Sequence, residues 1–146
     1  MARGFGSSGL DQGPCPCGSG CSYRECCGPF HQGQANAQTA EQLMRSRYSA
    51  YAKGDVEYLL ATHPDDQTPA AQRRRDLRNS CRQTRWLGLT ILEVNAGRRE
   101  DCEGTVSFEA QFSAGGQRGT LRETSLFQRA SHAQAGAWLY IRALEA

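Results

Sequence analysis

The chain has 146 residues, of which 38% are apolar and 22% charged, and its formal net charge is +2. This size allows one hydrophobic core of ordinary dimensions with a small appendage, and the nearly neutral charge excludes a general electrostatic attraction to nucleic acids or membranes. Because the amino terminus lacks the apolar run of a secretory signal and no stretch is apolar enough to span a bilayer, we expect a cytoplasmic protein without a membrane segment.

Cysteine is concentrated near the amino terminus. Five of the seven cysteines lie between residues 15 and 27, and Cys15, Cys17, Cys26 and Cys27 form the pattern C-x-C-x8-C-C. In a reducing compartment, an odd number of cysteines gathered at one end favours metal binding over a disulfide framework. Four thiolates complete the tetrahedral coordination of one structural Zn²⁺ and leave no position for water. An iron–sulfur centre is the alternative, although the C-x-C start does not match ferredoxin spacings.

Two other residues of this segment have open roles. Cys21 is a spectator thiol, an alternative ligand, or a redox-active partner when the metal is lost, and the complete set of four ligands favours the first. His31 is an alternative fourth ligand. Because Gly28 and Pro29 separate it from the cysteines, we favour a structural role or one that supports the ligands.

Three helices are predicted before the first strand. Thr39 caps a helix whose apolar positions recur at helical spacing until Gly54 ends it. Asp55 caps a second, shorter helix that Pro64 ends. The pair at 68–69, Thr-Pro, provides the N-cap and first position of a third helix, which runs toward Arg85.

After Trp86 the periodicity changes from helical to alternating. Apolar residues alternate over 87–91 and 106–112, Gly115 and Gly116 mark a hairpin turn, and further strands are predicted over 121–127 and 138–143. Helices followed by an antiparallel meander of four strands predict an α+β domain, in which three helices pack on one face of a curved four-stranded sheet.

Two parts of the sequence resemble known families. The run from Cys15 to Cys27, with Gly18, Ser19 and Gly20 in its loop, is similar to the SEC-C zinc motif, in which the fourth ligand is Cys or His. The segment TAEQLMRSRYSAYAKGDVEYLLATHP at 39–64, with WLGL at 86–89, ETSLF at 123–127 and WLY at 138–140, resembles the bacterial YchJ family. That family joins a SEC-C motif to a nuclear-transport-factor-two-like (NTF2-like) domain and has no established biochemical activity.

The resemblance implies a division of the chain. A SEC-C zinc knuckle is expected at 14–32 and a cone-shaped NTF2-like domain at 33–146. Residues 1–13, rich in glycine and serine, are expected to be a disordered tail.

The cone shape implied by the resemblance encloses a pocket between the first helix and the sheet. We expect Arg47 on the helix to form an inward ion pair with Glu123 on a strand; the alternative is that Arg47 extends along the helix edge into solvent. The candidate pocket residues are Arg47, Tyr48, Tyr51, Trp86, Glu123, Ser125, Phe127, Trp138 and Tyr140.

The predicted third helix carries an arginine-rich stretch. On a helix, Arg74, Arg78, Arg82 and Arg85 form one basic stripe, which nucleic-acid phosphates or an acidic protein surface could use. Because the chain is barely basic overall and lacks a nucleic-acid-recognition motif, a solvated helix face is the favoured interpretation.

Two classes of function are open. The favoured one is a protein-interaction or adaptor role, in which the knuckle, with Tyr23 and Phe30, is a docking surface, because the resemblance implies that SEC-C modules contact other proteins. The alternative is a small-molecule-binding protein or an enzyme of the lyase or isomerase type that uses the pocket. No residue is assigned as catalytic, because His63 and His132 belong to no convergent constellation and favour structural roles. A homodimer formed through the sheet is a further expectation from the fold.

Overall fold

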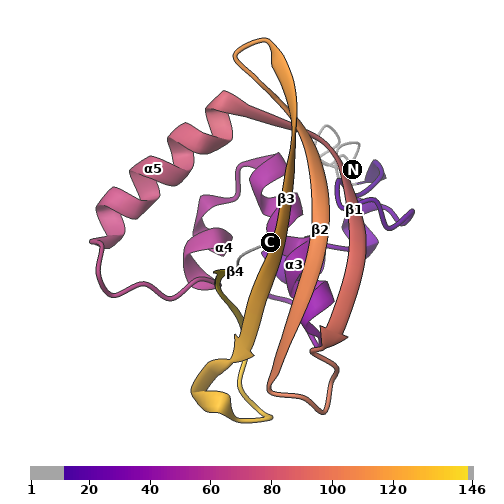
Figure 1. Ribbon diagram of the computed structural model, residues 1–146, viewed down its shortest axis with the longest axis vertical. Coiled ribbons are helices and arrows are strands. Elements are labelled where there is room, and N and C mark those ends of the chain that lie inside the picture. Colours follow the sequence, from indigo (N-terminus) through magenta and orange to yellow (C-terminus); the bar gives the residue numbers. More distant parts are fainter. Residues whose placement is uncertain (1–11, 145–146) are drawn as a thin grey trace, which may run out of the picture.

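An antiparallel sheet of four strands, with helices packed on one face, forms the frame of the computed structural model, which describes residues 12–144 (Figure 1). The strands pair in chain order, β1-β2-β3-β4, so the predicted meander is confirmed. Most of the tail predicted at 1–13 lies outside the described residues.

The elements follow the predicted order, with three additional short helical segments, of which two lie in the cysteine-rich region and one lies between the last two strands. No helix within residues 12–144 combines the length and the apolar character needed to cross a bilayer. The elements are η1 (Tyr23–Glu25), α2 (Gly28–His31), α3 (Ala40–Lys53), α4 (Val56–Ala61), α5 (Ala70–Gln83), β1 (Thr84–Ala96), β2 (Glu103–Ala114), β3 (Gln117–Arg129), η2 (Ala130–His132) and β4 (Trp138–Leu144).

Local signals place the ends of α3 and α4 as predicted. The Thr39 side chain accepts a hydrogen bond from the backbone N–H of Gln42 at 3.1 Å, and Gly54 ends α3 with a φ of 78°. Glycine suits this position because it adopts positive φ without steric cost. The Asp55 carboxylate accepts from the backbone N–H of Tyr58 at 3.1 Å and so begins α4.

The third predicted helix ends earlier than expected. α5 stops at Gln83, and Arg85 is the second residue of β1, where it pairs with Ser113 of β2. A β-branched residue and an aromatic residue on either side of Arg85 favour a strand, and pairing with β2 stabilises it. The prediction that Arg85 belongs to the basic stripe of the third helix was therefore wrong. α5 has no buried residue and extends away from the sheet (Figure 1).

α3 is the central helix because it is covered from two sides. Leu43, Met44 and Tyr48 pack against the apolar face of the sheet, where Val106 and Phe108 of β2 are also buried. The cysteine-rich segment covers another side of α3, and the contact makes one continuous core. The buried cluster includes Cys15, Cys17, Tyr23 and Cys27.

One buried arginine that sequence reasoning did not single out holds two loops together. Arg129 is 8% exposed, and its guanidinium donates to the carbonyl oxygens of Asp101, Arg99 and Gly136 at 2.8, 2.7 and 3.0 Å. Its Cζ also lies 4.7 Å from the ring centroid of Trp138. The β1–β2 loop and the segment before β4 are thus tied to the end of β3.

Candidate metal centre and internal cavity

The four predicted ligands converge on one point. The Sγ atoms of Cys15, Cys17, Cys26 and Cys27 all lie within 4.8 Å of one another. Two of these separations are 3.6 Å, between Cys17 and Cys26, and 4.0 Å, between Cys26 and Cys27. Sulfur atoms at 2.3 Å from a tetrahedral ion are about 3.8 Å apart, so the arrangement fits a four-thiolate metal site. Cys26 is partly exposed and the other three are buried.

A short backbone loop brings the two cysteine pairs together. The N–H of Cys15 donates to the carbonyl of Cys21 at 2.9 Å, and the N–H of Gly18 donates to the carbonyl of Cys15 at 3.2 Å. Gly18 and Gly20 have φ values of 79° and 89°, which only glycine adopts readily. The chain therefore turns back tightly between the pairs, and η1 then delivers Cys26 and Cys27.

Close contact between the thiols, together with burial, shifts pKa values within this cluster. Hydrogen bonds from Cys17 and Cys27 lower the pKa of Cys15, whereas burial raises the pKa of Cys26 to about 11. The hydrogen bond with Cys15 raises the pKa of Cys27. The thiolate of Cys15 is thus stabilised by hydrogen bonds within the cluster. A bound cation favours the thiolate form of every ligand, so metal binding releases protons.

The two residues with open roles lie outside the sulfur cluster. Cys21 is exposed, and its backbone N–H donates to Ser19 Oγ at 3.1 Å. The ring of His31 is nearly buried, with Nδ1 at 2.7 Å from the hydroxyl of Tyr23 and Nε2 at 2.8 Å from the carbonyl oxygen of Ser46. Because both ring nitrogens are occupied, His31 connects the knuckle to α3 instead of binding the ion.

Other α3 side chains complete this attachment. Arg45 donates to the carbonyl oxygen of Cys17 at 2.8 Å, and Ser49 Oγ lies 3.4 Å from Sγ of Cys15. The ammonium of Lys53 lies 4.2 Å from the ring centroid of Tyr23. The knuckle is therefore packed against the domain and is not a separate tip.

A cavity of about 260 Å³ lies on the other side of α3, between this helix, the sheet and α5. Eight of the nine candidate pocket residues line it. Trp138 does not: it is buried beside a separate cavity of about 100 Å³, and its Nε1 donates to the carbonyl of Gln38 at 3.1 Å. The lining consists of Met44, Arg47, Tyr48, Tyr51, Ser80, Trp86, Phe108, Ala110, Leu121, Glu123, Ser125, Phe127 and Tyr140.

The expected ion pair between Arg47 and Glu123 is not formed. Arg47 is 7% exposed, and its Nη1 donates to the carbonyl of Leu59 at 3.0 Å and to Oγ1 of Thr62 at 2.6 Å. These acceptors lie at the carboxyl-terminal end of α4, so the packing of α4 on α3 decides where the guanidinium points. The solvent-exposed alternative is also wrong. Burial lowers the pKa of Arg47, but guanidinium groups remain protonated in proteins.

Glu123 belongs to a hydrogen-bonded group with two hydroxyls. Its Oε2 accepts from Ser125 Oγ at 2.6 Å and from the Tyr140 hydroxyl at 3.1 Å. Burial and the nearby carboxylate raise the pKa of Tyr140, so the phenol is a hydrogen-bond donor near neutral pH. The Tyr140 ring also lies beneath Arg47, with 4.9 Å from Cζ to the ring centroid.

His63 packs against the ring of Tyr140. Its ring centroid is 4.9 Å from that of Tyr140, in an edge-on arrangement. Burial, followed by the charges of Arg47 and Arg73, lowers the pKa of His63. His132 is exposed in η2, and neither histidine lines the cavity.

The remaining arginines of the basic stripe lie on α5, and part of their charge is paired. Arg74 Nε lies 2.7 Å from Oε2 of Glu57 on α4. Arg78 and Arg82 are exposed, and within residues 12–144 neither has an ion-pair partner.

Sequence reasoning missed several cavity residues. Phe108 and Ala110 lie two residues apart on β2, and Leu121 of β3 pairs with Ala110. Because every second side chain of a strand points to the same face, this spacing could have identified them as facing inward. Ser80 of α5 has no comparable signal, because its position depends on how α5 crosses the edge of the fold.

Sequence comparisons identify relatives along most of the chain. A family model described as YchJ, middle NTF2-like domain, matches residues 39–143. The UPF0225 protein SCO1677 of Streptomyces coelicolor is 46% identical over 127 residues, which are 87% of this chain and 91% of that protein. A UPF0225 protein of Cupriavidus metallidurans is 41% identical over 138 residues, covering 93% and 92% of the two chains.

Solved structures agree with this relationship. The solution structure of RPA3114, a SEC-C motif containing protein from Rhodopseudomonas palustris, has a TM-score of 0.73 and 32% identity, with 90% of this chain and 98% of that chain covered. The crystal structure of a SEC-C motif containing protein from Psychrobacter arcticus also has a TM-score of 0.73, with 25% identity and coverage of 94% and 86%. The chain therefore belongs to the YchJ family of bacterial proteins, in which a SEC-C cysteine cluster precedes an NTF2-like domain.

Proposed function

We propose that the four cysteines bind one structural zinc ion. Four converging thiolates favour Zn²⁺ in closed tetrahedral coordination, and the sulfur separations in the structure support this choice. With all four positions taken by sulfur, the ion has no site for a substrate or water. Its role is to hold the knuckle in the shape that packs against α3.

Elemental analysis of paired variants tests this proposal. Cys17→Ser removes a buried ligand, and we expect its zinc content to fall well below one ion per chain. Cys21→Ser changes a cysteine of the same loop that lies outside the cluster, and this variant should keep one ion. Equal zinc contents in the two variants, or the visible absorption of an iron–sulfur centre in the purified protein, would contradict the assignment.

We propose further that the NTF2-like domain binds a small molecule in the cavity beside α3. The observation that carries this proposal is that Arg47 and Glu123 line one largely aromatic cavity without forming an ion pair. A purely structural core would be filled with apolar side chains or would pair its charges. An apolar pocket with a few polar groups is instead typical of a ligand site.

Filling the cavity tests this function. Leu121→Trp places a larger side chain in the cavity lining, whereas Leu92→Trp makes the same change at a similarly exposed position outside it. Ethylbenzene, an apolar probe, should shift the NMR signals of cavity residues in the wild type and in Leu92→Trp but not in Leu121→Trp. Shifts of the same size in the wild type and in Leu121→Trp would show that the probe binds outside the cavity and would contradict the proposal.

Protein docking through the knuckle is the second candidate function. It is favoured by the exposure of the loop at 18–21, which is held against α3 and so presents a fixed surface. Tyr23, expected at this surface, is instead 8% exposed and packs inward. A partner that copurifies with the wild type and with Arg82→Glu, but not with Ser19→Arg, would support docking. Equal recovery with both variants would reject it.

A further inference from the structure

Arg47 lines the cavity and uses only part of its hydrogen-bonding capacity on other described residues. Both hydrogens of its Nη1 are used by α4, through the carbonyl of Leu59 and the hydroxyl of Thr62. Among residues 12–144, no acceptor is hydrogen-bonded to its Nε or Nη2, although the side chain is 7% exposed and lines the cavity. Buried N–H groups are rarely left unpaired, because each costs free energy to remove from water.

Within the part of the chain that the structure describes, Glu123 has an unused hydrogen-bond acceptor, which is the complement of the unused donors of Arg47. Its Oε2 accepts from the hydroxyls of Ser125 and Tyr140, whereas Oε1 has no donor among the described residues. Glu123 also lines the cavity. The pocket therefore presents one fixed positive group with free donors and one fixed negative group with a free acceptor.

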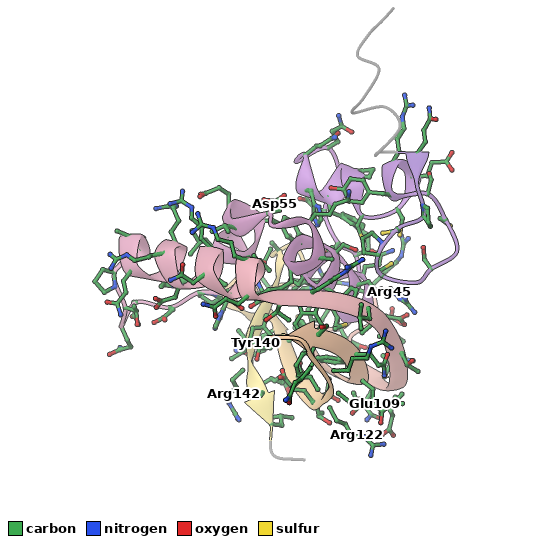
Figure 2. All side chains as sticks on the ribbon, turned by 90° about the horizontal axis from the view of Figure 1, so that it is seen from above. Arg45, Asp55, Glu109, Arg122, Tyr140 and Arg142 are labelled. Carbon is green, nitrogen blue, oxygen red and sulfur yellow. The ribbon has the colours of Figure 1, made fainter. Side chains whose placement is uncertain are left out.

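These two groups are held apart. No nitrogen of Arg47 lies within 4.0 Å of an oxygen of Glu123. Tyr140 connects them, because its ring lies beneath the guanidinium and its hydroxyl donates to the carboxylate. Figure 2 shows Tyr140 on the helical side of the sheet, away from Glu109 and Arg122, which form a pair on the other side.

We propose that the cavity binds a zwitterionic, α-amino-acid-like molecule, whose carboxylate accepts from Arg47 and whose ammonium donates to Glu123. This inference rests on the small-molecule function proposed above and specifies the ligand. A simple anion gains Arg47 but meets the charge of Glu123, and a simple cation has the reverse difficulty. A head group with both charges satisfies both side chains through charge-assisted hydrogen bonds.

The aromatic side chains that line the rest of the cavity determine which kind of ligand body fits. Trp86 contacts the rings of Tyr48 and Tyr51 edge-on, at centroid distances of 5.8 and 6.4 Å, and Phe127 contacts Tyr140 in the same way at 5.8 Å. Such walls favour an apolar body, and above all a flat ring, which can add further edge or offset contacts. An amino acid with an aromatic side chain has both the required head group and such a body.

A matched series of probes separates the contributions of head and body. Ethylbenzene, 3-phenylpropionate, 2-phenylethylamine and L-phenylalanine share one body and carry no head group, the anion alone, the cation alone, and both charges. Their dissociation constants can be measured from the NMR shift of the Trp86 indole, which lines the cavity. We expect L-phenylalanine to bind at least about tenfold more tightly than either singly charged probe.

Variants of two glutamates on the sheet provide the control. Glu123→Gln keeps the shape but removes the charge, so the preference for L-phenylalanine over 3-phenylpropionate should fall about tenfold. Glu109→Gln makes the same change on the opposite face of the sheet, and the preference should stay as in the wild type.

The outcomes distinguish the two proposals. If ethylbenzene binds but L-phenylalanine binds no better than 3-phenylpropionate, the zwitterion inference is overturned while small-molecule binding stands. An unchanged preference in Glu123→Gln would also overturn it. If none of the four probes binds the wild type, the small-molecule function fails as well.

Discussion

Replacing His31 with asparagine should loosen the knuckle from α3 without removing the metal. The change removes hydrogen bonds of 2.7 and 2.8 Å to Tyr23 and to the carbonyl of Ser46. Each such bond contributes about 1 kcal/mol net. The His31 ring also packs against Tyr58, with 4.7 Å between centroids, and the loss of such ring contacts costs about 1 kcal/mol more. We therefore expect the free energy of unfolding to fall by about 3 kcal/mol and Tm by about 10 °C.

Urea unfolding of the zinc-loaded protein, followed by circular dichroism, measures this loss, and elemental analysis measures the metal. His132→Asn is the control, because His132 is exposed and has a φ of 52°, which asparagine tolerates. Its stability should change by no more than about 0.5 kcal/mol. Loss of zinc from His31→Asn would make this residue a ligand and refute the reasoning. Unchanged stability would show that the connection to α3 contributes little.

Three further predictions concern the rest of the domain. Because burial lowers the pKa of His63 in the folded state, the unfolded chain binds the proton more readily, and stability should decline as pH falls below about 6.5. His63→Gln should flatten this decline in urea titrations at several pH values, and equal slopes would contradict the prediction. Gly97→Ala should cost about 2–4 kcal/mol, since its Cβ would lie 2.7 Å from the first Cβ of α3 at a φ of 72°; Gly33→Ala has a φ of 75° but open space, and should cost only about 1–2 kcal/mol. Arg129→Lys loses a planar fork that donates to several backbone carbonyls, so we expect a loss of about 2–4 kcal/mol by urea unfolding, against less than about 0.5 kcal/mol for the exposed Arg122→Lys. Similar losses of stability for the two glycine variants, or for the two arginine variants, would contradict the explanation by close contacts and by hydrogen bonds, respectively.

Features that depend on neighbouring residues could be predicted from the sequence. The caps at Thr39 and Asp55 and the end of α3 at Gly54 are local hydrogen-bonding and φ requirements, and the structure has each of them. The convergence of the cysteines was also predictable, because the glycines between the two pairs allow the tight turn.

Features that depend on packing between distant elements could not be predicted from the sequence. Arg47 was expected to pair with Glu123, but its acceptors belong to the end of α4, and no local sequence pattern determines how α4 packs on α3. His31 lies in the knuckle and its acceptor lies on α3, fifteen residues away. Arg85 continues an arginine pattern typical of a helix, yet cross-strand pairing with β2 determines its conformation.

Residues of α3 that contact the knuckle alternate along the helix with residues that line the cavity. Arg45 and Ser49 contact the cysteine segment, whereas Arg47 and Tyr51 line the cavity. Both contacts are made from one helix, so a displacement of α3 at the knuckle would also move the cavity lining; any coupling between the two proposed occupants would then act by the same factor in both directions.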